Sequence, residues 1–156
     1  MASFALRALR SELFAPLFDL DDVALGARNM ERILVEGAHS HPCRVSLADA
    51  AIGEQVLLLS HTHQPANSPY HASGPIFVRR GVAQAVCMPD TLPDALLRRL
   101  MSLRAYDAGD RIIAAEVRDG PEVAAWLHRT LDDANVAYVH VHFARYGCYF
   151  CRADRA

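Results

Sequence analysis

The chain has 156 residues, of which 52% are apolar and 22% charged, and its formal net charge is −2 at pH 7. This composition is typical of a globular domain that can bury an adequate core, and the small net charge argues against nucleic acid or an anionic membrane as a partner. All sixteen basic side chains are arginine, so the chain has no lysine for Schiff-base chemistry.

We expect a single domain, residues 1–156, that works in the cytoplasm. Arg7 and Arg10 interrupt the apolar N-terminus, and no segment reaches the ~18 apolar residues that a membrane-spanning helix needs. Four cysteines in a chain that can build its own core indicate free thiols rather than a disulfide framework. The sequence leaves the oligomeric state open.

The N-terminal half contains short predicted elements. A strand over 4–9 is followed by a short helical turn over 11–18 and a helix over 19–27, which Asp19 or Asp21 would cap. Two further strands, over 32–36 and 54–60, flank the loop GAHSHP.

The segment 62–75 is predicted to be irregular, because it contains three prolines and a glycine. A loop of this length in a compact domain is usually functional or disordered. It ends in a predicted strand over 76–79.

The C-terminal half gives clearer patterns. Strands over 100–106 and 111–117 flank the sequence DAGD, which predicts a β-hairpin. A helix is predicted over 122–133, with Pro121 in its first turn and apolar residues at helical spacing. Those apolar residues are Val123, Trp126, Leu127 and Leu131.

Strands over 135–143 and 148–152 complete the chain. Many strands with few helices predict an α+β fold with a mostly antiparallel sheet. We expect one main helix, about 122–133, and a shorter N-terminal helix packed on one face.

Alternation along two strands places histidine, tyrosine and arginine away from the core. In 137–143, Val139, Val141 and Phe143 face one way, so Tyr138, His140 and His142 face the other. In 100–106 the same rule separates Met101, Leu103 and Ala105 from Ser102, Arg104 and Tyr106. The sequence SHTH adds His61 and His63 at the same spacing. These side chains bind, donate and titrate, whereas a merely hydrated face favours Thr, Glu and Lys.

Five segments along the chain resemble one known family. They cover 41–50, 53–63, 68–79, 103–108 and 138–149, and read HPCRVSLADA, GEQVLLLSHTH, SPYHASGPIFVR, LRAYDA and YVHVHFARYGCY. Together they are similar to the bacterial family with the domain of unknown function (DUF) 1203, from about residue 4 to the C-terminus. Because that family is uncharacterised, the resemblance implies no reaction, cofactor or substrate.

A metal site is one hypothesis for the histidines. Two H-x-H pairs, His61 with His63 and His140 with His142, would combine with a thiolate into a zinc shell. The alternative is hydrogen-bonded strand histidines without a metal. No acidic residue accompanies either pair, so no metal ligand is assigned.

A thiol centre is the second hypothesis. Cys148 and Cys151 form a C-x-x-C sequence, but in a strand their sulfurs would point to opposite faces and a disulfide would be strained. Cys148, which follows Gly147, keeps the better prospect of reactivity, and the alternative is a buried, inert thiol.

The third hypothesis is a small-anion site without redox or metal chemistry. Arg44 and Arg104 would hold a carboxylate or phosphate, while Tyr70 and Tyr106 supply hydroxyls and ring faces. The loop SPYHASGP would close over the ligand. The alternative is that the arginines pair with carboxylates and the tyrosines are ordinary half-buried rings. The candidate carboxylates are Asp49, Asp107 and Glu116.

Together these patterns predict a small-molecule site with His, Arg and Tyr side chains. Its candidate catalytic residues are His140, His142, His61 and Cys148, and its candidate substrate-binding residues are Arg44, Tyr70, Arg104 and Tyr106. The site belongs either to a His-based enzyme, metal-assisted or Cys/His, with a small anionic substrate, or to a non-catalytic anion-binding or protein-interaction module. No fingerprint for a nucleotide cofactor is present, and the cofactor is unknown.

Overall fold

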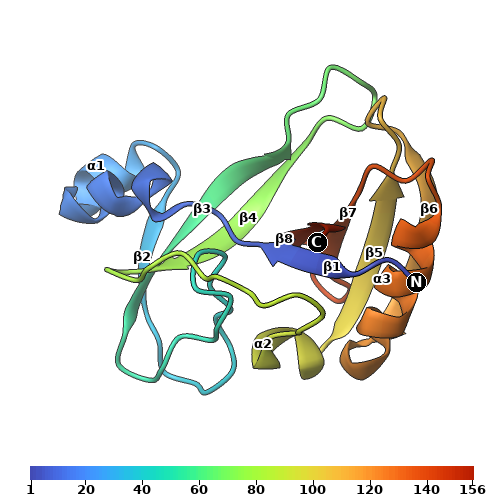
Figure 1. Cartoon of the computed structure of the whole chain (residues 1–156). Coiled ribbons are helices and arrows are strands. Elements are labelled where there is room, and N and C mark those ends of the chain that lie inside the picture. The colour runs from blue at the N-terminus through green and yellow to red at the C-terminus, as the bar shows by residue number, and fades with distance from the viewer.

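Two antiparallel sheets organise the chain in the computed structural model, which describes residues 1–156. The larger sheet has the strand order β1-β8-β7-β5-β6 and the smaller β2-β3-β4 (Figure 1). The predicted α+β class with mostly antiparallel strands is confirmed. The strands are β1 (Phe4–Arg7), β2 (Glu31–Leu34), β3 (Gln55–Gln64), β4 (Ala72–Arg79), β5 (Leu100–Tyr106), β6 (Ile112–Asp119), β7 (Tyr138–Phe143) and β8 (Tyr149–Arg155).

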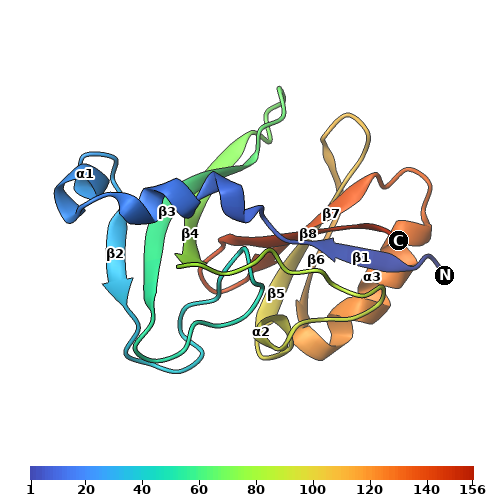
Figure 2. The same cartoon turned by 60° about the vertical axis from the view of Figure 1, so that its left-hand side comes forward.

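The main helix, α3 (Val123–Asp132), lies along one face of the larger sheet (Figure 2). It contacts β1 and β8 and buries an apolar stripe that includes Trp126 and Leu127. A short helix, α1 (Asp22–Gly26), lies beside β2, and the side chain of Asp21 caps it as predicted. Another short helix, α2 (Asp94–Leu97), precedes β5 and was not predicted.

The alternation predicted for β5 and β7 is confirmed. Met101, Leu103 and Ala105 are fully buried, together with Val139 and Val141, in a core of twenty residues under α3. A second core of nine residues lies between the smaller sheet and the N-terminal turns. The opposite face of β5 and β7 is therefore free to present polar side chains between the sheets.

The prediction of an irregular segment over 62–75 is wrong at both ends. Strand β3 continues to Gln64 and β4 begins at Ala72, so only 65–71 form the connection. Pro75 fits in β4 because this strand is at the edge of its sheet, where a missing N–H breaks no ladder. The connection lies beside the β5–β6 turn, and Ser68 Oγ donates to the carbonyl of Asp110 at 3.4 Å (Figure 1).

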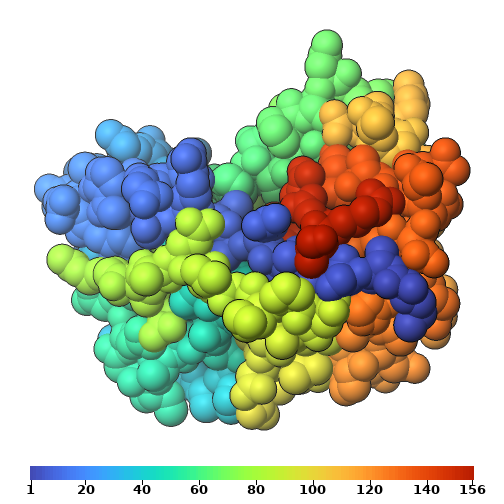
Figure 3. Space-filling view, in the orientation of Figure 1, coloured from blue at the N-terminus to red at the C-terminus, as the bar shows by residue number.

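The two ends of the chain are neighbours in the larger sheet. Strand β1 pairs antiparallel with β8, and the C-terminal residues lie against the N-terminal strand in Figure 3. No helix has both the length and the apolar character needed to cross a bilayer.

Candidate functional site

Three histidines from both sheets form a cluster between them. His63 of β3 lies 5.0 Å from His142 and 6.1 Å from His140, measured between ring centroids. Tyr149 of β8 stacks on His63 at 5.3 Å with an interplanar angle of 9°. We call His63, His140 and His142 the histidine cluster.

A β-bulge near the end of β3 separates the two histidines of the SHTH sequence. The pairing of β3 with β4 shifts register between Thr62 and Gln64, which changes the alternation of side chains. His63 therefore contacts the histidines of β7, whereas the His61 ring lies 6.0 Å from Phe14 at the smaller core.

Burial keeps the three imidazoles neutral. It is the largest cause that lowers the pKa of His63 to about 4 and the pKa of His140 and His142 to about 3. The positive charge of Arg104 lowers all three further, and neighbouring imidazoles add to the effect. Neutral imidazoles can accept hydrogen bonds as well as donate them.

Arginine and tyrosine surround the cluster on the same sheet face. Arg104 lies directly opposite His140 in the pairing of β5 with β7 and is half-buried, and its side chain forms no ion pair or hydrogen bond. The Tyr106 ring lies 4.9 Å from His140 and 6.3 Å from Tyr70. The structure thus brings together His140, His142, Arg104 and Tyr106, which the alternation placed on one face, and adds Tyr70 from the connection between β3 and β4.

A buried hydrogen-bonded network joins the two sheets next to the cluster. Gln64 Nε2 donates to the Tyr138 hydroxyl at 2.8 Å, and that hydroxyl donates to Asp110 Oδ1 at 2.6 Å. Burial and the bond to Asp110 raise the pKa of Tyr138 to about 12, so the phenol stays protonated. The network fixes the ends of β3 and β7 relative to each other.

Arg44 and Cys148 belong to a separate cavity of about 720 Å³, lined by residues from both sheets. No carboxylate lines this cavity, although four arginines do. We call it the arginine cavity. Its basic, imidazole and thiol groups are Arg44, Arg98, Arg99, Arg145, His39, His41 and Cys148.

Arg44 is buried without a carboxylate partner. Its side chain is 1% exposed, and it donates to the carbonyls of Tyr149, at 2.7 Å, and Pro42. The remaining contact is from Nη2 to Cys148 Sγ at 3.1 Å, and no ion pair involves Arg44. Burial lowers the pKa of Arg44 because the guanidinium loses its hydration, although Cys148 opposes this effect.

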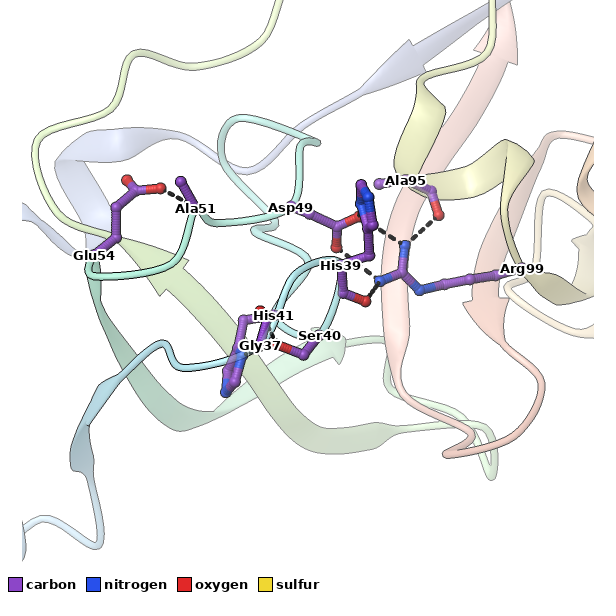
Figure 4. A network of polar contacts seen from close by, with 9 residues as sticks. All are labelled: Gly37, His39, Ser40, His41, Asp49, Ala51, Glu54, Ala95 and Arg99. Carbon is purple, nitrogen blue, oxygen red and sulfur yellow. Dashed lines mark hydrogen bonds and ion pairs between the residues drawn. The ribbon is translucent and has the colours of Figure 1, made fainter.

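Asp49 is not available to Arg44 because Arg99 holds it. Arg99 donates to both carboxylate oxygens of Asp49, at 2.7 and 3.1 Å, and to the carbonyls of His39 and Ala95 (Figure 4). Sequence analysis missed Arg98, Arg99 and Arg145. In a chain whose only strong cation is arginine, no local signal marks those that line a cavity.

The two cysteines of the C-x-x-C sequence lie in different surroundings. Cys148 is half-buried at the cavity, whereas Cys151 is fully buried in the larger core. Burial raises the pKa of the Cys151 thiol. All four cysteines are free.

The predicted residues therefore divide between two places, with His61 in neither. Arg44 and Cys148 line the arginine cavity, and the other predicted residues surround the histidine cluster. No group of three or more His, Cys, Asp or Glu side chains is arranged to hold a metal ion.

Fold and sites together define a two-sheet α+β protein with polar groups held between its sheets. The chain belongs to the family described as Protein of unknown function (DUF1203), whose model matches residues 40–155. No curated protein and no solved structure matches the chain.

Proposed function

We propose that this protein binds a small anionic molecule in the arginine cavity. One observation carries the proposal: the buried guanidinium of Arg44 has no carboxylate partner. A buried charge without an oppositely charged partner lowers the stability of the fold by roughly several kcal/mol, and an anionic ligand would offset that loss. A carboxylate or phosphate also matches the planar donor geometry of guanidinium.

The size and lining of the cavity support a metabolite-sized ligand. About 720 Å³ falls within the range of roughly 300–1,000 Å³ typical of small-molecule sites. Phe77 and Phe143 add apolar surface, and the guanidinium groups of Arg44 and Arg99 lie 5.0 and 5.3 Å from the Phe143 ring. This lining suits a small organic acid or phosphate ester with an apolar part.

The proposal is tested by thermal unfolding with malonate, inorganic phosphate and the uncharged analogue malonamide at constant ionic strength. A ligand at a hundred times its Kd stabilises the folded state by about 2.7 kcal/mol, which raises Tm by several degrees. We expect malonate or phosphate to do so and malonamide not to. If all three compounds leave Tm unchanged, the proposal is wrong.

Variants of the cavity locate the binding. Arg98→Gln and Arg145→Gln each remove one charge from exposed lining residues, and we expect each to weaken anion binding about tenfold. Arg28→Gln and Arg129→Gln are matched controls, because both arginines are exposed and lie outside the cavity. Equal losses in all four variants would indicate screening of overall charge rather than a site.

The contact between Arg44 and Cys148 favours a second candidate, a thiol-dependent enzyme that acts on the bound anion. Cysteine thiolates are nucleophiles, and cationic neighbours favour them. We expect iodoacetate to alkylate Cys148 faster than neutral iodoacetamide does, and malonate to slow the reaction. Mass spectrometry of Cys148→Ser provides the control, and equal rates for both reagents would remove the support for this candidate.

The state of the cysteines also supports a cellular location. Four free thiols suit a reducing compartment, and we propose that the protein works in the cytoplasm.

A further inference from the structure

The histidine cluster contains three buried nitrogen atoms without a hydrogen-bond partner. They are His63 Nδ1, His140 Nδ1 and His142 Nε2. The side chains of His140 and His142 are 3% and 0% exposed. Most buried polar side-chain atoms in proteins are hydrogen-bonded, so three orphaned atoms in one cluster point to a missing partner.

The chemical state of His142 follows from its contacts. Its Nδ1 lies 3.0 Å from the carbonyl oxygen of Gly147, which only accepts, so Nδ1 carries the hydrogen. Because burial lowers the pKa of His142 to about 3, the ring is neutral and Nε2 holds a lone pair. His142 Nε2 is therefore a buried acceptor without a donor.

Arg104 supplies the opposite chemistry nearby. Its side chain forms no ion pair or hydrogen bond, and it is a diagonal neighbour of His142 because Ser102 is directly opposite that histidine. Diagonal neighbours across a sheet are about 7–8 Å apart at their Cα atoms, which a small molecule can bridge. The positive charges of Arg104 and Arg152, both of which lower the pKa of His140, act against a metal cation here.

We infer that the histidine cluster and Arg104 form a second ligand site, which binds a small molecule carrying an O–H donor beside an anionic oxygen. The hydroxyl donates to His142 Nε2, and the anionic oxygen accepts from the Arg104 guanidinium. The unpaired nitrogens of His63 and His140 each add one donor or acceptor. A hydroxy acid and a hydrogen phosphate share this chemistry, and the site is distinct from the arginine cavity.

Matched ligand pairs test the inference. Glycolate and acetate differ by one hydroxyl, and at pH 7 inorganic phosphate keeps a hydrogen that sulfate lacks. We expect glycolate to bind at least tenfold more tightly than acetate, or phosphate at least tenfold more tightly than sulfate. Discrimination between glycolate and acetate indicates a hydroxy acid as the source of the O–H group, and discrimination between phosphate and sulfate indicates a hydrogen phosphate. Equal affinity within both pairs overturns the inference.

The ¹⁵N resonance of His142 Nε2 shows where the ligand binds. In the wild-type protein we expect the preferred ligand to shift this resonance through the new hydrogen bond, and Arg104→Gln to weaken that response at least tenfold. Arg111→Gln, an exposed arginine of the same hairpin, is the control and should leave the response unchanged. An unmoved resonance at saturating ligand means that only water occupies the cluster, and the inference fails.

The same measurements separate this site from the arginine cavity. Arg145→Gln should weaken the malonate effect on Tm without changing the response of His142 Nε2, since Arg145 lines only the cavity. Metal analysis of the purified protein is the last test. A stoichiometric transition metal that is lost in His63→Phe would overturn the inference and leave the proposal for the cavity intact.

Discussion

Lowering the pH from 7 to 5 is expected to destabilise the folded protein through the histidine cluster. Burial, the largest cause, lowers the pKa of His140 and His142 to about 3, from an ordinary value of 6.5. As the pH falls through 6.5, these imidazoles take up protons in the unfolded chain but stay neutral in the folded protein. Their contribution to stability is therefore complete above pH 6.5 and is lost as the pH falls toward 3.

The magnitude depends mainly on the unfolded state. With an unfolded pKa of 6.5 and a folded pKa well below 5, each histidine removes about 2 kcal/mol of stability between pH 7 and pH 5. The two buried histidines together remove about 4 kcal/mol, a large part of the roughly 5–15 kcal/mol that stabilises a typical domain. His63 is half-buried and contributes less, because solvent screens it.

Urea unfolding at pH 7 and pH 5, at constant ionic strength, measures the effect. We expect His140→Gln to reduce the pH-dependent loss by about 2 kcal/mol, whereas the exposed control His71→Gln should leave it unchanged. The choice of pH 5 avoids most carboxylate titration. The reasoning is refuted if the wild-type protein loses less than about 1 kcal/mol, or if the His142 ring titrates near pH 6.5 in an NMR experiment.

Two further predictions concern the scaffold, and urea unfolding checks both. Gly120→Ala should destabilise the protein by at least about 1–3 kcal/mol, because the added Cβ would lie 2.5 Å from the carbonyl oxygen of Leu97. Gly26→Ala, where no atom lies within 4 Å, is the control, and equal effects would refute the steric argument. Tyr138→Phe should cost about 1–3 kcal/mol through its two lost hydrogen bonds. Tyr146→Phe, at a ring that is 91% exposed, should cost almost nothing, and an equal loss there would contradict this reasoning.

The alternating faces of β5 and β7 could be predicted because local residue order decides them. Both strands lie inside the larger sheet with one face on the core, so apolar and polar residues alternate without interruption. This pattern was enough to predict that one surface carries His140, His142, Arg104 and Tyr106. The alternation predicts the direction of a side chain only where the strand is regular.

The arrangement of the sheets and the division of the site could not be predicted in the same way. Pairing between distant strands leaves no local pattern, and the bulge that turns His63 toward β7 depends on the register of β3 with β4. Prolines suggested a loop over 62–75, whereas an edge strand tolerates Pro75. Arg44 lies between β2 and β3 in the sequence, far from Cys148. The two side chains meet only in the folded chain, so no local pattern predicts their contact.

Three consecutive residues, 147–149, connect the two candidate sites. The carbonyl of Gly147 fixes the tautomer of His142, while Cys148 and the carbonyl of Tyr149 both accept from Arg44. Gly147 has a φ of 76°, which a residue with a side chain rarely adopts, so the turn that aims these groups in both directions depends on glycine. A substitution that changes this turn would therefore disturb the contacts of both His142 and Arg44.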